Sequence, residues 1–349
     1  MRVLKALTGG KSAIKDDVPT PTLRPDYVTV RTKAVALNPT DWKHINFVDT
    51  VCTIGCDFAG VIEEVGSAVT KPWKKGDRVF GFVHGGNVVH PEDGAFGEYV
   101  TAKGDLLMKI PDDLKFKEAA PLGVGIVTCG LGLYQSLELP WPNEPAKEKF
   151  PILIYGGSSA TGVMGIQMAK LSGLEVIATC SPRNFDLLKS FGADHVFDYN
   201  SPTCAADIKK LTNNSLYYAW DTISEKNSPQ ICCDALSDQK QPDGNKPQYG
   251  SILPVKDFPR SDVEHKYILG YTVVGEEFRM GPRKIEAKPQ DFEFTKKFVQ
   301  VAEKLVAEKK IRPHRSEVRD GGLDGIFGGL DDLKNGKVSG IKIVYKLED

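Results

Sequence analysis

The sharpest change in hydrophobic pattern along the chain lies between residues 150 and 184. An apolar run from Ile152 to Tyr155 ends at Gly156 and Gly157, and apolar residues then recur at helical spacing until Leu171. A second apolar run, Leu174 to Thr179, follows. This order predicts strand, turn, helix and strand. The alternation continues, with further strands expected within 195–199, 217–224 and 248–255 and helices within 183–193, 204–212 and 228–238. The fold class predicted for this region is α/β, a doubly wound parallel sheet.

The segments that come before and after this region have a different texture. Alternating apolar and polar residues at 27–37, 60–66 and 77–83 predict a β-rich, barrel-like lobe. The C-terminal part carries a long amphipathic helix at 291–310, a shorter helix at 325–336 and a last strand at 341–347, which we expect to complete that lobe. The predicted domains are 1–122, 123–275 for the doubly wound sheet, and 276–349 as the return segment.

Composition narrows the function classes. The 349 residues carry 45 basic and 46 acidic side chains without long runs of one sign, so no charge pattern favours nucleic acid or an anionic membrane. No apolar stretch approaches the ~20 residues that span a bilayer, and the N-terminus lacks the apolar core of a signal peptide. We therefore expect a cytoplasmic protein. Its seven cysteines include no CxxC pair and favour reduced, mostly buried thiols.

The turn after the strand at 152–155 carries the first candidate site. Gly157, Ser159 and Gly162 occupy the three glycine positions of the GxGxxG pattern, with serine at the second. A glycine-bearing turn before a helix lets a pyrophosphate approach the backbone N–H groups at the helix start. We therefore predict a dinucleotide here. The contacts are expected from Gly157, Ser158, Ser159, Ala160, Thr161 and Gly162.

The end of the following strand indicates which dinucleotide binds. NAD-dependent enzymes place an acidic residue there for the ribose 2′-OH, whereas this chain has Cys180, Ser181, Pro182, Arg183 and Asn184. A hydroxyl and a guanidinium suit the 2′-phosphate of NADPH. The alternative is an ordinary solvated arginine at the start of the next helix.

Several motifs together resemble the medium-chain dehydrogenase/reductase superfamily. They are NPTDWK, GCDFAGVIEEVG, KKGDRVFGF, GAFGEYV and IKIVYKL, in that order along the chain. Within the superfamily, the segments NPTDWKH, YGGSSATG, ATCSPRNFDLLKSFGA and VFDY are similar to zinc-independent quinone and enoyl reductases. They are most similar to the fungal trans-acting enoyl reductases of polyketide synthases. This resemblance implies a GroES-like catalytic lobe, a Rossmann domain and NADPH.

The resemblance also indicates whether the chain binds a catalytic zinc ion. Zinc-dependent members have the sequence GHE, in which histidine is a ligand, where this chain has Gly55, Cys56 and Asp57. A catalytic zinc needs three protein ligands. His84 and His90 have no neighbouring cysteine and are expected to be loop residues, so we predict no metal. Hydride addition to the β-carbon of an α,β-unsaturated carbonyl remains feasible without a Lewis acid.

The segment NPTDWKH supplies the leading catalytic candidate. Pro39 can begin a helical turn, and Thr40 and Lys43 are then three residues apart on one face. The resemblance places this segment beside the nicotinamide ribose and gives Lys43 a proton-relay or oxyanion role; the alternative is a solvated lysine. Thr128 is the second catalytic candidate, in a small-residue run that a tightly packed helix explains nearly as well. The other cofactor contacts implied are Asp41, Trp42, Tyr199, Asp221, Thr222, Leu253, Pro254, Val338 and Ser339.

Substrate contacts are expected from two segments. They are Thr128, Cys129, Leu131, Tyr134 and Gln135 in the first, and Gly270, Tyr271, Thr272 and Val273 in the second. Residues 271–274 also match the strand that pairs dimers in quinone reductases, and we expect a monomer or weak dimer. Possible partners are a carrier-bound substrate and a polyketide synthase. Two other functions stay open: reduction of quinones, enals or aldehydes in detoxification, and non-catalytic NADPH binding as in crystallin-type relatives.

Overall fold

The computed structural model describes residues 1–347 and divides into two compact units. The first unit comprises residues 1–127 and 271–349, and the second comprises residues 128–270. The predicted division was 1–122, 123–275 and 276–349. The structure therefore places residues 123–127 and 271–275 in the first unit rather than with the parallel sheet.

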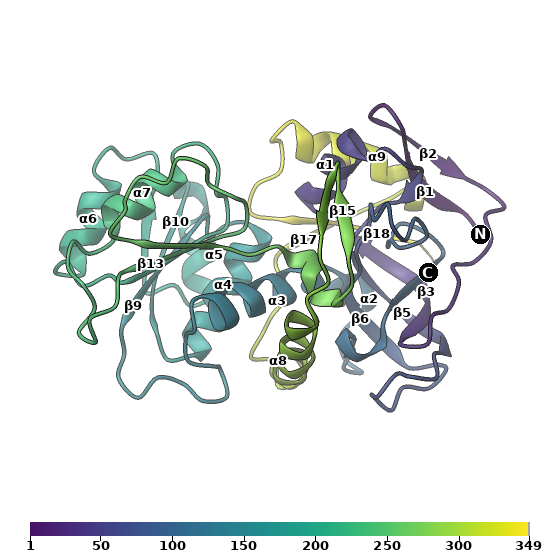
Figure 1. Cartoon of the computed structure of the whole chain (residues 1–349), viewed down its shortest axis with the longest axis horizontal. Coiled ribbons are helices and arrows are strands. Elements are labelled where there is room, and N and C mark those ends of the chain that lie inside the picture. Colours follow the sequence, from purple (N-terminus) through teal and green to yellow (C-terminus); the bar gives the residue numbers. More distant parts are fainter. Residues whose placement is uncertain (348–349) are drawn as a thin grey trace. The chain divides into compact units, whose positions relative to one another are not determined.

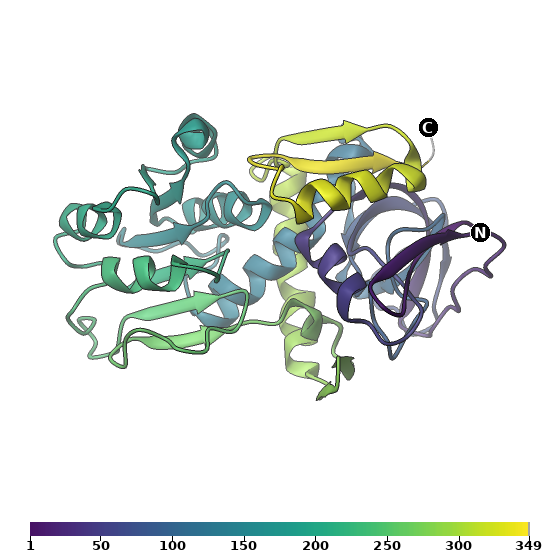
Figure 2. The ribbon, with the colours of Figure 1, turned by 90° about the horizontal axis from the view of Figure 1, so that it is seen from above.

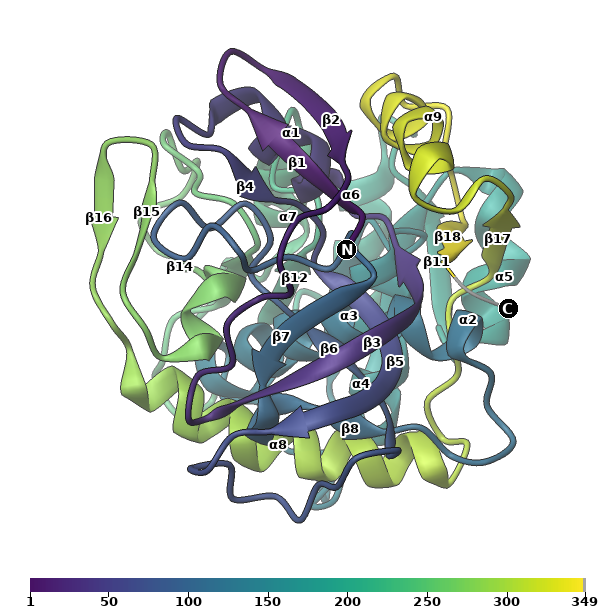
Figure 3. The ribbon, with the colours of Figure 1, turned by 90° about the vertical axis from the view of Figure 1, so that its right-hand side faces the viewer.

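The first unit is built around a seven-stranded sheet (Figures 1 and 3). Its strands are β3 (Tyr27–Ala36), β5 (Asp57–Val65), β6 (Arg78–Phe82), β7 (Tyr99–Lys103), β8 (Met108–Lys109), β17 (Ser316–Arg319) and β18 (Lys342–Lys346). The order is β17-β18-β3-β5-β6-β8, with β7 also paired to β3. Because β18 pairs antiparallel with β3, Val344 opposite Ala36, the last strand completes the first lobe as predicted.

Smaller elements surround this sheet. β1 (Val3–Leu7) pairs with β2 (Lys11–Lys15) and β4 (Cys52–Thr53), and β15 (Phe278–Met280) forms a hairpin with β16 (Arg283–Ile285). α8 (Pro289–Ala307) packs along β8 (Figure 3), and α9 (Gly322–Lys334) packs on β18 and on α1 (Pro39–Phe47) (Figure 2). Short helical segments complete the unit: η1 (Gly104–Leu106), α2 (Phe116–Ala119), η2 (Ala120–Leu122) and most of α3 (Gly123–Cys129).

The second unit is a six-stranded parallel sheet of order β11-β10-β9-β12-β13-β14. Its strands are β9 (Pro151–Tyr155), β10 (Glu175–Cys180), β11 (His195–Asp198), β12 (Tyr218–Asp221), β13 (Gln248–Ser251) and β14 (Glu264–Tyr267). Its helical segments are η3 (Gly130–Ser136), α4 (Ala160–Leu171), η4 (Pro182–Asn184), α5 (Phe185–Ser190), α6 (Cys204–Leu211) and α7 (Ser228–Ala235). The strand order reverses between β9 and β12, which is where doubly wound sheets bind ligands.

All seven cysteines are buried, and none is bonded to another. The segment expected as a dimer strand is instead the 3₁₀ helix η5 (Gly270–Val274). This 3₁₀ conformation is stabilised because the ring of Tyr271 is buried against aromatic neighbours, and Gly275 ends the helix with φ of 74°.

One helical stretch, Phe116–Ser136, has the length and apolar character of a membrane span. However, 78% of its apolar 18-residue window is buried inside the structure, which is typical of a core helix.

Candidate active site

The glycine turn of the second unit has the predicted strand–turn–helix form. β9 ends at Tyr155, Gly156 adopts φ of 73°, and α4 begins at Ala160 with Ser159 as its N-cap. Ser159 Oγ accepts a hydrogen bond from the Gly162 N–H at 2.9 Å. A Cβ at Gly162 would collide with the Gly156 carbonyl oxygen and lie 2.8 Å from the Gly157 Cα. The close packing of backbone on backbone therefore requires glycine at position 162.

The end of β12 is tied to this turn. The Thr222 hydroxyl donates to the Tyr155 carbonyl at 2.8 Å and lies 2.9 Å from Ser159 Oγ. The structure thus brings together two predicted cofactor residues at the point where the strand order reverses. Asp221 is fully buried, and its carboxylate accepts bonds from the Ile223 and Ser224 N–H groups. The Asp221 carboxylate thus holds the loop that follows β12.

The residues predicted to contact the adenosine 2′-phosphate of the cofactor follow β10 and β11. Ser181 Oγ and the Tyr199 hydroxyl are 3.3 Å apart, and Tyr199 is 37% exposed. Arg183 is exposed in η4, whereas Asn184 is buried. Two hydroxyls and a guanidinium therefore come from one end of the sheet. All three groups can donate hydrogen bonds to an anion.

In the first unit, α1 begins as the sequence predicts. Pro39 occupies the first helical position, and Asn38 and Asp41 form a capping box, in which the Asn38 N–H donates to Asp41 Oδ2 at 2.7 Å. Thr40 and Lys43 are both half-buried. The Lys43 ammonium lies 5.8 Å from the ring centroid of Trp42.

A buried ion pair anchors the start of this helix. Asp57 is 0% exposed, and its Oδ2 lies 2.9 Å from Lys342 Nζ and accepts from Asn38 Nδ2 at 2.9 Å. Lys342 also donates to Asn38 Oδ1, and Asp57 Oδ1 accepts from the Val124 N–H at 2.6 Å. Sequence reasoning missed Asn38 and Lys342 as members of the site, because the two residues are 304 positions apart.

Beside this ion pair lies a group of buried polar side chains. Thr40 Oγ1 hydrogen-bonds the Tyr271 hydroxyl, and His44 Nδ1 lies 3.2 Å from the first oxygen and 3.5 Å from the second. Burial lowers the pKa of His44 to about 4, so the imidazole is neutral at pH 7. His44 was missed by sequence reasoning, although its spacing of four residues from Thr40 in NPTDWKH is a signal that a helix would bring them together.

His84 has a different environment from the one predicted. It follows β6 in a loop, as expected, but it is only 1% exposed and its ring stacks on Tyr271 with centroids 4.1 Å apart. Burial lowers the pKa of His84 well below its ordinary value. Among residues 1–347, no group of three His, Cys, Asp or Glu side chains could hold a metal ion.

The predicted substrate residues at 128–135 lie in the second unit. Thr128 is 8% exposed, and a Cβ at Gly270 would lie 3.7 Å from its hydroxyl, so the structure brings these two residues together. The Cys129 thiol donates to the Thr161 carbonyl, and the Tyr134 hydroxyl lies 3.0 Å from Ser172 Oγ. Leu131 and Tyr134 are buried and Gln135 is half-buried.

The remaining predicted residues are spread over both units. The Leu253 carbonyl accepts from Ser251 Oγ, and Pro254 is exposed beside it. Thr272 donates to the Asp291 carboxylate, and Val273 is fully buried. Val338 packs on the core of the first unit, and Ser339 is exposed. Their roles stay predictions.

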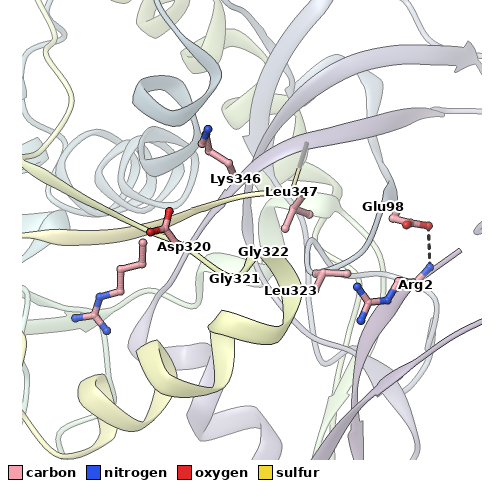
Figure 4. Close-up of a pocket in the computed structure, with 9 residues that line it drawn as sticks. Arg2, Glu98, Asp320, Gly321, Gly322, Leu323, Lys346 and Leu347 are labelled. Carbon is pink, nitrogen blue, oxygen red and sulfur yellow. Dashed lines mark hydrogen bonds between the residues drawn. The ribbon is translucent and has the colours of Figure 1, made fainter. Parts of the chain in front are cut away.

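A surface pocket in the first unit contains none of these residues. It lies at the start of α9 and is lined by Arg2, Glu98, Asp320, Gly321 and Lys346 among others (Figure 4). Arg2 is already paired with Asp16 and Asp324, both at 3.0 Å. Its charge is therefore compensated within the protein.

Comparisons with known proteins agree with this architecture. Residues 24–112 match the alcohol dehydrogenase GroES-like domain, and residues 160–239 match the zinc-binding dehydrogenase domain. The trans-enoyl reductase ACTTS2 of Alternaria alternata is 48% identical over 335 residues, 95% of each chain. The chain belongs to the trans-enoyl reductase family of the medium-chain dehydrogenase/reductase superfamily.

Further relatives extend this result. The trans-enoyl reductase TOXD of Cochliobolus carbonum is 53% identical over 259 residues, 74% of this chain and 85% of that protein. Among solved structures, the CurK enoyl reductase matches with a TM-score of 0.73 at 20% identity, covering 99% of this chain and 98% of that one. This confirms the predicted fold class, a GroES-like lobe with a Rossmann domain, and the chain is a reductase of the medium-chain type.

Proposed function

We propose that the protein reduces the carbon–carbon double bond of an α,β-unsaturated thioester, using NADPH and no metal, on an intermediate carried by a polyketide synthase. The observation that carries this proposal is the 48% identity to a trans-enoyl reductase over 95% of both chains. The substrate is then an enoyl chain presented by a carrier protein of the partner synthase.

The proposed cofactor is NADPH, held by the second unit. The Gly157–Gly162 turn would hold the pyrophosphate, and Ser181, Arg183 and Tyr199 would surround the 2′-phosphate. No acidic residue stands in the turn 180–184, where a ribose 2′-OH would require one. The reduced nicotinamide supplies the hydride that adds to the substrate β-carbon.

The first unit supplies the groups that handle the charge formed on the substrate. Addition at the β-carbon moves the π electrons onto the carbonyl oxygen, giving an enolate that collapses when its α-carbon takes a proton. Lys43 and Thr40, half-buried on one face of α1, are proposed as donors to that oxygen. Cys56, where zinc-dependent members have a histidine ligand, is buried and its thiol pKa is raised well above the ordinary value by burial, which favours the neutral thiol.

A test of Lys43 follows directly. Lys43→Ala should lower kcat by about 10²-fold if the ammonium stabilises the enolate oxygen, while the dissociation constant for NADPH changes little. Lys33→Ala, which removes another half-buried lysine, this one on β3, serves as the control and should keep the wild-type rate. An unchanged rate in Lys43→Ala would leave that residue as a solvated lysine.

The proposed function is tested by mixing the protein and NADPH with three probes: an enoyl pantetheine thioester, a short quinone and an aldehyde. We expect the nicotinamide absorbance to fall with the thioester, and the thioester product to be saturated. Faster turnover of the quinone or aldehyde would favour a detoxifying reductase. A flat absorbance with all three, together with tight NADPH binding, would favour a non-catalytic NADPH-binding protein.

We also propose a cytoplasmic protein that acts as a monomer or weak dimer. Sedimentation of the purified chain over a range of concentrations tests the second part of this proposal.

A further inference from the structure

The hydroxyl groups of Thr40 and Tyr271 meet in the first unit although 231 residues separate them in the chain. His44 Nδ1 lies 3.2 Å from the Thr40 oxygen and 3.5 Å from the Tyr271 oxygen, so the three polar atoms form a small triangle. Thr40 is half-buried, whereas His44 and Tyr271 are 3% and 8% exposed. Thr40 is therefore the most exposed of the three residues.

The position of the Tyr271 hydroxyl is fixed by the packing of its ring. One face stacks on His84 with centroids 4.1 Å apart and an interplanar angle of 21°. His44 and Phe278 pack near-perpendicular to the ring, at 5.2 and 6.1 Å. These contacts leave the hydroxyl little freedom, and the β15–β16 hairpin supplies one of them. The Cys56 thiol lies beside the same hydroxyl.

The protons on the three polar groups determine whether the Thr40 hydroxyl donates or accepts a hydrogen bond. A threonine hydroxyl has one proton and two acceptor lone pairs. Burial raises the pKa of Tyr271 well above its ordinary value, so this hydroxyl keeps its proton and can donate. The neutral His44 ring carries one N–H, and in the tautomer that places it on Nδ1 this group donates to the Thr40 hydroxyl.

In that arrangement, with the Tyr271 hydroxyl donating as well, both lone pairs of Thr40 Oγ1 are used. Its own proton then needs another acceptor, and within residues 1–347 Thr40 Oγ1 has no hydrogen-bond partner beyond Tyr271 and His44. We propose that Tyr271 and His44 are positioning residues that orient the Thr40 hydroxyl as a hydrogen-bond donor to the carbonyl oxygen of the substrate. This inference rests on the proposed function.

The consequence for the reaction concerns the enolate. The Thr40 O–H bond stays intact and its hydrogen bond shortens as negative charge collects on the substrate oxygen. Tyr271 O–H strengthens that donor by polarising the Thr40 oxygen, as in any chain of hydrogen bonds. The effect should therefore appear in kcat more than in KM.

The experiment is a double-mutant cycle on Thr40 and Tyr271, measured with NADPH and an enoyl pantetheine thioester. Thr40→Val should lower kcat by about 10²- to 10³-fold, and Thr40→Ser should retain most of the rate. Tyr271→Phe, which keeps the ring, should lower kcat by roughly 10-fold with little change in KM. In the Thr40→Val background Tyr271→Phe should have no further effect, because its path runs through Thr40.

Controls separate this role from a structural one. Tyr267→Phe removes a hydroxyl from a tyrosine that is 40% exposed and should match wild type. His44→Asn, which can retain an N–H near Nδ1, should keep more activity than His44→Leu, and this pair remains informative if Tyr271→Phe folds poorly. NADPH affinity and melting temperature should stay near wild type for each folded variant.

Three results would overturn the assignment: an unchanged kcat in Tyr271→Phe, additive losses in the double mutant, or equal loss in His44→Asn and His44→Leu. If wild type reduces an enone but not the thioester, the proposed substrate is wrong, and the same cycle on the enone decides the role of Tyr271. Inactivity of wild type on every probe would overturn both proposals.

Discussion

The two helices that carry the predicted chemistry begin in contrasting ways. At the start of α4, the cap comes from the neighbouring sequence: Ser159 accepts from Gly162 three residues later, and the Gly157 N–H donates to the Thr179 carbonyl. At the start of α1, Asn38 contacts Lys342, 304 residues away, and Thr40 contacts Tyr271, 231 residues away. The first site is shaped by backbone and glycine, and the second by buried side chains from distant segments.

This difference decides how each site responds to substitution. The turn before α4 is formed by backbone, so it is disrupted when an added side-chain atom overlaps that backbone. The buried side chains around α1 are destabilised when a buried charge loses its partner. The network around α1 should therefore dominate the stability of the first unit, while the turn before α4 should control ligand affinity. The following substitutions separate these two roles.

The largest effect is expected from Lys342→Met. The change leaves Asp57, which is 0% exposed, without its cation, and breaking such a buried pair costs about 3–5 kcal/mol. Urea denaturation should show this loss of unfolding free energy. The matched control is Lys337→Met, since Lys337 is 60% exposed and pairs with Asp332 on the surface. Equal stability of the two variants would mean that the Lys342–Asp57 pair is not buried in solution.

Gly162→Ala tests the turn before α4. The added Cβ would collide with the Gly156 carbonyl, and because backbone must move to relieve it, NADPH affinity should fall on the order of 10²-fold. Gly165→Ala in the same helix is the control, because its Cβ would lie 3.5 Å from Trp220 in ordinary contact. Fluorescence titration with NADPH measures both. Similar affinities for the two variants would contradict a turn that requires glycine at 162.

The same contrast explains what the sequence predicts well. The β9–α4 unit, the cap at Ser159, the parallel sheet and the Pro39 helix start follow from local pattern, and the structure has each of them. The triangle of Thr40, His44 and Tyr271 depends on how separate segments pack, which local periodicity does not encode. For that reason His44 was missed, His84 was expected only as a loop residue, and residues 271–274 were matched to a strand although they lie in η5.

Asp41→Asn tests how the buried side chains around α1 affect the pH dependence of the unfolding free energy. Burial raises the pKa of Asp41 to about 7, its Oδ1 has no partner in the described chain, and Asp57, Lys342 and Cys56 lie nearby. Because the folded pKa lies above the unfolded value, near 4, the carboxyl favours folding in its protonated form, and this stabilisation is lost as pH rises from about 4 to about 7.

Asparagine does not titrate. Relative to wild type, Asp41→Asn should have similar stability near pH 4 and be more stable by about 4 kcal/mol at pH 8, the free energy that separates a pKa near 4 from one near 7. Thermal or urea unfolding across that range measures the difference, in which the contribution of other groups cancels. Parallel stability curves for the two proteins would show that Asp41 ionises in the folded state as readily as in the unfolded chain.

The smallest effect is expected at the adenosine end of the second unit. Arg183→Ala removes an exposed guanidinium beside Ser181 and Tyr199, so the dissociation constant for NADPH should rise about 10-fold, the value of roughly one charge-assisted hydrogen bond. Affinity for NADH, which lacks the 2′-phosphate, should not change. Lys189→Ala on α5 removes a comparable exposed charge and should leave the NADPH-to-NADH ratio as in wild type. If Arg183→Ala weakens both cofactors equally, the residue supports the shape of the loop after β10 and does not recognise the phosphate.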